Sequence, residues 1–206
     1  MKCVSFFAVA AIALCANAWV SIDDMEADIS IALTNDSYLL SADFTNQLNA
    51  ATSSQSAEMR SEAHMLLSMN AYKNFLDTAE ESWIPRELSH ASNAVVAIGA
   101  NSDKWQFWMA RLVHSLAYVS LDDYTASLGM ATNTIAMRES SGYTNETSSL
   151  ERAILSRYEM CGVDLIGGLK ITAGMAAASA GQSSLATNYA NQVSSPYREI
   201  ILEFVR

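Results

Sequence analysis

Apolar residues recur every three or four positions along most of the chain, and this spacing predicts helices. No run of alternating apolar and polar residues with hairpin turns interrupts the pattern. The predicted helices cover 25–32, 40–51, 59–76, 85–98, 105–119, 124–135, 154–176 and 182–193, with a short last one from 195 to 205. Glycines at 162, 167 and 168 predict a break or kink in the helix over 154–176. The pattern therefore predicts an all-α fold.

Particular residues mark where these helices begin and end. Pro85 suits a first helical turn, because the amide that it lacks would be unpaired there. Gly99 predicts a left-handed cap at the end of the same helix, and Ser102 is expected to cap the next one. Residues 138–147 are polar and predict a loop. The segment 148–151 (Ser-Ser-Leu-Glu) has the spacing of a capping box, which predicts a helix start.

Short connections between several neighbouring helices predict that consecutive helices pack antiparallel, as helical hairpins. Predicted helix starts near Ser56, Asp103 and Ser149 are separated by roughly 46 residues, within the range of known helical repeats. The regularity favours a stacked array of hairpins.

The segment 170–196 carries the clearest repeat-like pattern. Gly174 and Ala177 lie on one predicted helix, Gly181 lies in the turn, and the next helix carries Ala186, Ala190 and Val193. This resembles the small-residue pattern of a tetratricopeptide repeat, although Lys170 replaces the usual aromatic residue and Ala177 the usual tyrosine. The resemblance implies antiparallel hairpins stacked as a short right-handed array. A compact orthogonal helical bundle is the alternative.

The first eighteen residues have the three parts of a secretory signal peptide. Met1-Lys2 is the charged start, residues 3–15 are uncharged and mainly apolar, and Ala16-Asn17-Ala18 is a small-residue cleavage site. Cleavage after Ala18 would leave a single helical domain, residues 19–206, in the periplasm or outside the cell. Two alternatives would tether the chain to the membrane: an uncleaved signal, or a lipid on Cys15, since residues 12–15 loosely resemble a lipoprotein box.

Composition narrows the possible partners. The formal net charge is -10, and the lysines and arginines are scattered without a basic patch. Nucleic acid and anionic membrane surfaces are therefore not expected as partners. Beyond the signal the sequence predicts no membrane span, and Cys161 is the only cysteine, which excludes an internal disulfide. Cys161 is expected to be a small buried residue rather than a nucleophile.

An aromatic cluster stands at the start of the helix over 105–119. Trp105 and Trp108 share a face of that helix, and Phe107 points nearly the opposite way. Packing between neighbouring helices is the first interpretation of such a two-sided apolar helix. The alternative is that Trp105, Phe107 and Trp108 bind a partner in a groove, because aromatic residues are frequent in binding hot spots.

Three histidines, His64, His90 and His114, lie on consecutive predicted helices. Counted along the helices, His90 and His114 should lie at similar heights, with His64 roughly 10 Å away. A zinc site would need all its ligands around one ion, and no paired metal motif is present. Isolated histidines are therefore predicted, with a three-histidine metal site as the alternative. No cofactor and no catalytic residue is predicted.

These features favour an exported, non-enzymatic helical-repeat protein that binds a protein or peptide partner, or serves as a scaffold, in the cell envelope. One alternative is an α-helical envelope enzyme or metal-binding protein that uses the histidines. The other is a structural component of the envelope.

Overall fold

The computed structural model describes residue 40 and residues 42–143, 149–158, 160 and 162–205. These residues form helices and no strand, which confirms the all-α prediction. The helices are α3 (Ala42–Ala51), α4 (Ala57–Thr78), α5 (Trp83–Ile98), α6 (Trp105–Ser120), α7 (Tyr124–Ser141), α8 (Ser149–Arg157), α9 (Leu165–Ser179), α10 (Ser183–Ala190) and α11 (Tyr197–Val205). The expected signal peptide, the expected helix over 25–32 and Cys161 lie outside the described residues.

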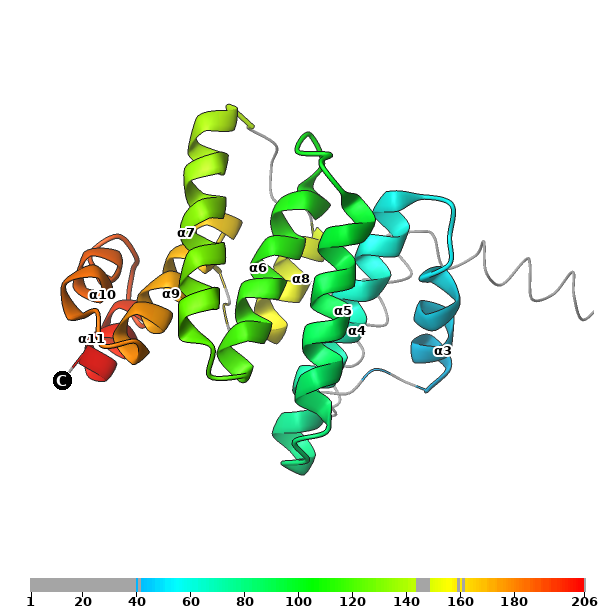
Figure 1. The fold of residues 1–206 in the computed structure, drawn as a ribbon, viewed down its shortest axis with the longest axis horizontal. Coiled ribbons are helices and arrows are strands. Elements are labelled where there is room, and N and C mark those ends of the chain that lie inside the picture. Colours follow the sequence, from blue (N-terminus) through cyan, green and yellow to red (C-terminus); the bar gives the residue numbers. More distant parts are fainter. Residues whose placement is uncertain (1–39, 41, 144–148, 159, 161, 206) are drawn as a thin grey trace, which may run out of the picture.

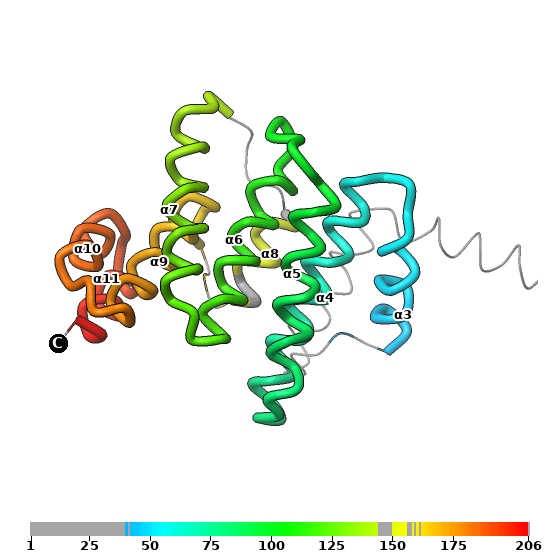
Figure 2. The backbone as a smooth tube through the Cα atoms, in the orientation of Figure 1, coloured from blue at the N-terminus to red at the C-terminus, as the bar shows by residue number. Residues whose placement is uncertain are grey.

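From α3 to α7 the helices follow one another along the long axis of the molecule, and α10 and α11 lie at the end opposite α3 (Figures 1 and 2). Helix α8 instead lies back beside α5 and α6 in this view, and it contacts α4 and α9. From α3 to α7 each helix packs against the next, and α9 packs against α7, α10 and α11. Helix α4 also contacts α6, and α6 also contacts α9. One apolar core runs through all of these contacts. The right-handed tetratricopeptide-like arrangement stays a prediction.

Side-chain caps fix the starts of three helices. The Ser56 hydroxyl accepts a hydrogen bond from the Met59 amide at the start of α4. The Asp123 carboxylate does the same for Ala126 in α7, and Asp164 for Gly167 in α9. Each cap pairs an amide that has no partner within its own helix. The predicted helix starts near Ser56 and at Tyr124 are therefore confirmed.

Three predicted boundaries differ from the structure. Helix α5 begins at Trp83, two residues before Pro85, which still lies in the first turn. Ser102 does not cap α6; its carbonyl instead accepts a hydrogen bond from the Trp108 indole nitrogen at 3.0 Å. Helix α7 continues to Ser141 and ends at Gly142 with a left-handed cap, so the first residues of the predicted polar loop are helical.

The expected break in the segment 154–176 is present, because α8 ends at Arg157 and α9 begins at Leu165. Gly162, in the connection, has a φ of +73°, a backbone conformation that residues other than glycine rarely adopt. Asp164 then restarts the helix as the cap of α9. The break brings Tyr158 and Met160 beside α9 instead of continuing one long helix.

Helix α11 approaches the backbone of α9 at Gly174. A Cβ atom at this position would lie 2.7 Å from Ile201 Cδ1, so the missing side chain permits the close approach. Ile201 is fully buried in this contact. Tyr197 and Ile200 lie within about one helical turn of Ile201 on α11. The contact therefore holds both residues beside α9. No helix among the described residues is long and apolar enough to cross a membrane.

Candidate functional site

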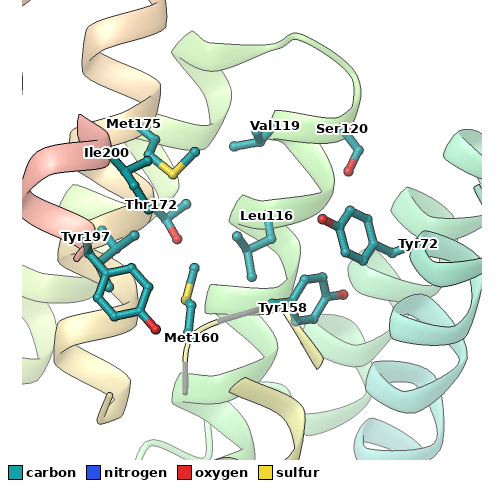
Figure 3. A pocket seen from close by; sticks show the side chains of 11 residues that line it. Tyr72, Leu116, Val119, Ser120, Tyr158, Met160, Thr172, Met175, Tyr197 and Ile200 are labelled. Carbon is teal, nitrogen blue, oxygen red and sulfur yellow. The ribbon is translucent and has the colours of Figure 1, made fainter. Parts of the chain in front are cut away.

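A pocket of about 240 Å³ lies between α4, α6, α9, α11 and the segment that follows α8 (Figure 3). We call it the α6–α9–α11 pocket. It is lined by Tyr72, Leu116, Val119, Ser120, Tyr158, Met160, Ile171, Thr172, Met175, Tyr197 and Ile200. The lining residues of α6, α9 and α11 are three or four positions apart or adjacent, so each of these helices presents one face to the pocket.

Both sides of the pocket mix apolar surface with hydroxyl groups. Figure 3 shows Tyr72, Tyr158 and Ser120 on one side. The opposite side includes Met175 and Ile200, together with Thr172 and Tyr197. Because methionine side chains are flexible and polarisable, this side can adapt to the shape of a bound apolar group.

Glu87 of α5 lies behind the side of the pocket that carries Tyr158 and Ser120. Its side chain is fully buried, and neither carboxyl oxygen has a hydrogen-bond partner of ordinary geometry. Burial raises the pKa of this carboxyl to about 7, although the nearby Ser120 hydroxyl acts in the opposite direction. The Ser68 hydroxyl donates to the Glu87 backbone carbonyl at 3.0 Å, which anchors α5 to α4 here. A buried carboxyl with a raised pKa is a frequent feature of functional sites.

Tyr158 lines the pocket and lies close to Glu87. Its hydroxyl is buried without a hydrogen-bond partner, and its ring lies 5.1 Å from that of Tyr72. Burial, followed by the charge of Glu87, raises the pKa of the Tyr158 hydroxyl well above its ordinary value. The hydroxyl is therefore a neutral group buried behind the pocket wall, with Glu87 and Ser68 beside it.

Exposed apolar side chains lie on the same elements as the pocket. Four large ones are between 37 % and 57 % exposed: Leu76, Leu121, Ile200 and Phe204. Ile200 lines the pocket, and the other three lie within one helical turn of Tyr72, Ser120 and Ile200 along the chain. Val96 of α5 is the one remaining large hydrophobic side chain of the described residues with comparable exposure. The other four exposed apolar side chains are therefore near lining residues of the pocket along the chain.

The same elements carry exposed acidic residues. These are Asp77 after Leu76, Asp122 and Asp123 after Leu121, and Glu199 and Glu203 on α11. We call the four exposed apolar side chains and these five acids the pocket rim. The rim combines apolar surface with negative charge, which favours an apolar group with cationic neighbours.

The aromatic cluster of α6 lies elsewhere. Phe107 and Trp108 are 3 % and 1 % exposed, and their rings make an edge-to-face contact with centroids 4.8 Å apart. Trp105 is partly buried and packs against the same core. The first interpretation, packing between helices, therefore fits the structure. The alternative of a partner groove formed by all three rings does not fit, because two of them are enclosed by neighbouring helices.

The predicted heights of the histidines were wrong. His64 and His90 face each other with their Nδ1 atoms 3.2 Å apart. Hydrogen bonds from Ser61 Oγ to the Ala94 carbonyl, and from Ser68 Oγ to that of Glu87, fix the register of α4 against α5. The histidine pair lies between these two bonds, a register that counting along isolated helices does not give.

His114 is separate from the other two histidines and stacks on Tyr118 with ring centroids 4.7 Å apart. Burial lowers its pKa. In the part of the chain that the structure describes, no three histidine, cysteine or acidic side chains lie close enough to hold a metal ion. The three-histidine alternative is therefore not formed.

The sequence did contain a signal for Glu87. It stands on the helical stripe of Ala91, Ala94 and Ile98, all of which are buried. A charged residue on an otherwise apolar stripe indicates a buried carboxyl. The sequence offered no comparable signal for Tyr158 and Ser120. They line the same pocket only because the chain breaks after α8 and α4 packs against α6.

Comparisons with protein-family models, curated proteins and solved structures found no match to this chain.

Proposed function

We propose that this chain is an exported, non-enzymatic protein that binds a peptide segment of a protein partner through the α6–α9–α11 pocket. One large apolar side chain of the peptide enters the pocket, and basic residues beside it face the pocket rim. The observation that carries the proposal is a pocket whose lining residues have exposed apolar and acidic residues next to them along the chain.

The size of the pocket favours one side chain over a cofactor or extended ligand. Pockets for drug-sized molecules measure about 300 to 1,000 Å³, and this one measures about 240 Å³. Binding hot spots typically place a single aromatic or aliphatic anchor in a desolvated pocket. The hydroxyl groups of Tyr72 and Ser120 at one side would suit the indole N–H of tryptophan or the hydroxyl of tyrosine.

The position of Glu87 supports binding rather than catalysis. A general acid or base has to lie within hydrogen-bond reach of the reacting atom. Glu87 is not among the residues that line the pocket, whereas its neighbours Tyr158 and Ser120 are. The carboxyl therefore acts on a bound group only through the field and hydrogen-bonding capacity of its neighbours.

A peptide-binding experiment tests the proposal. The probe is a fluorescein-labelled peptide with one tryptophan flanked by two lysines on each side, and anisotropy measures its affinity for the purified protein. We expect binding that weakens when alanine replaces the tryptophan or glutamates replace the lysines. Added salt should also weaken it, because exposed charges are screened.

A matched pair of variants locates the site. Val119→Trp fills the pocket from α6 and should lower the affinity at least tenfold, about 1.4 kcal/mol. Val96→Trp makes the same change at an exposed position on α5 that does not line the pocket, and should leave the affinity unchanged. Equal binding by both variants, or no preference for tryptophan over alanine, would contradict the proposal.

Export is tested at the amino terminus of the protein recovered from cells. The signal pattern predicts that the mature chain begins at Trp19. N-terminal sequencing and mass measurement of the protein from the extracytoplasmic fraction should give that start. A lipid-modified Cys15 or an intact Met1 would instead show that the protein is tethered to the membrane and not released.

A further inference from the structure

We propose that His64 and His90, whose Nδ1 atoms face each other 3.2 Å apart across α4 and α5, form a two-histidine site for a divalent transition-metal ion. Cu²⁺ is the expected preferred ion, with water completing its coordination. The site is separate from the α6–α9–α11 pocket and does not rest on the peptide-binding proposal.

The geometry of the pair suits a shared ion. Zinc lies about 2.0 to 2.1 Å from a histidine nitrogen, so two such ligands at a tetrahedral angle are about 3.3 to 3.4 Å apart. The observed separation of 3.2 Å is close to this value. The rings are tilted by 36° with centroids 5.4 Å apart, so they are not stacked face to face. A small movement of either ring would admit an ion between the two nitrogens.

The surrounding helices hold the pair in place. Buried hydrogen bonds from Ser61 and Ser68 to carbonyl groups of α5 lie on either side of the histidines along the helix pair. Each histidine is thus placed on a rigid helix within one turn of an anchoring contact. Ligands on rigid elements lose little conformational freedom when they bind.

The protonation state of the pair also suits a metal. Burial lowers the pKa of His64 to about 4, with a further contribution from His90 and then from Arg60. Burial also lowers the pKa of His90. Both rings are therefore neutral at pH 7, which is the form that binds metals. The Arg60 guanidinium donates to the carbonyls of Ser54 and Gln55, which holds it toward the turn before α4.

Without metal, the short contact is a hydrogen bond in which one Nδ1–H donates to the other Nδ1. An ion bound to both atoms needs both lone pairs. The proton on Nδ1 therefore moves to Nε2 of the same ring, and no net proton is released. Both rings are only half-buried, so water can occupy the remaining coordination positions, as in open metal sites.

Imidazole ligands bind copper, nickel and zinc, and copper binds most tightly in the general order of divalent ions. The test uses the untagged, chelator-treated protein, titrated calorimetrically with CuCl₂, NiCl₂ and ZnCl₂ at pH 7. We expect one ion per chain, with Cu²⁺ bound most tightly. His64→Gln and His90→Gln should each lower the Cu²⁺ affinity at least about tenfold, on the scale of losses at metal sites. His114→Gln, a matched change on α6, should have no effect.

Two further measurements guard against a trivial result. Circular dichroism should show that all three variants stay helical. Copper electron paramagnetic resonance should show coupling to two imidazole nitrogens in the unmodified protein and to one in His64→Gln. The proposal is overturned if the unmodified protein does not bind metal, or if His64→Gln and His90→Gln bind as well as His114→Gln.

Discussion

The α4–α5 hairpin holds two titratable regions within about one helical turn of each other, and burial acts on them with opposite signs. His64 and His90 lose affinity for protons, since burial disfavours their positive form. Glu87 gains affinity for its proton, since burial disfavours its negative form. Both regions are therefore driven toward neutrality by the same cause. Their effects on folding oppose each other between pH 4.5 and 6.5.

The regions also differ in how their polar atoms are paired. The two histidine nitrogens face each other at hydrogen-bond distance. The oxygens of Glu87 and the hydroxyl of Tyr158 are buried with no such partner. An unpaired buried oxygen costs folding free energy unless something else compensates.

The largest expected effect on stability comes from Glu87→Gln. The carboxyl pKa of about 7, against an ordinary 4.5, corresponds to about 3 kcal/mol at about 1.4 kcal/mol per pKa unit. The folded state binds the Glu87 proton more tightly than the unfolded state does. Proton binding therefore contributes its full stabilisation of the folded state below pH 4.5, and this contribution is lost as the pH rises to 7. Glutamine stays neutral throughout. The stability of Glu87→Gln relative to the unmodified protein should therefore rise by about 3 kcal/mol between pH 4.5 and 8.

Urea unfolding at a series of pH values measures this difference directly. Glu81→Gln is the matched control, because Glu81 is exposed just before α5 and should shift stability by less than about 0.5 kcal/mol at any pH. A constant difference between Glu87→Gln and the unmodified protein across the whole range would show that Glu87 titrates normally, and the contrast with the histidines would disappear.

Residue patterns predicted the helices well because most helix starts and stops are local. Ser56, for example, caps α4 through a hydrogen bond from the amide three residues later. Gly142 also acts locally, but the residue pattern predicted an earlier end for that helix. Ser102 was misassigned because Lys104, two residues later, stands at the N-cap position of α6, and no side chain caps this helix. Capping propensity favours serine over lysine at an N-cap, so it points to the wrong residue here.

The candidate site was much less predictable, because it depends on register and on a break in the chain. The histidine pair required the exact offset of α4 against α5, which two buried serine hydrogen bonds determine. The pocket required Tyr158 to leave the helix after α8 and meet Tyr72 of α4. Periodicity shows which face of a helix is apolar, but it does not show which residue of a neighbouring helix that face meets.

A smaller effect of the opposite sign is expected from His64→Gln in metal-free protein. The folded pKa of about 4 lies below the ordinary 6.5, so the stabilisation is present above pH 6.5 and is lost as the pH falls to 4. Because the ring is half exposed, solvent screening reduces the effect to about 1 kcal/mol. The variant should lose less stability than the unmodified protein between pH 6.5 and 4.

The combined variant His64→Gln with Glu87→Gln separates the two regions further. Each single variant should change the slope of stability against pH in its own direction, and the combined variant should show the sum of the two changes. Equal slopes in the single variants would contradict the opposite signs assigned to the two regions.

The smallest expected effect is that of Tyr158→Phe, and it tests what the unpaired hydroxyl is for. Phenylalanine keeps the ring contact with Tyr72 and removes a buried hydroxyl that has no partner. Removing such a group is nearly neutral or stabilising, by up to about 1 kcal/mol. A stable variant that binds the tryptophan peptide less tightly than the unmodified protein would assign the hydroxyl to the ligand. A loss of more than 1 kcal/mol in urea unfolding would instead mean that the hydroxyl is hydrogen-bonded to Ser68 or Glu87, and that the pocket wall is as well paired as the histidines.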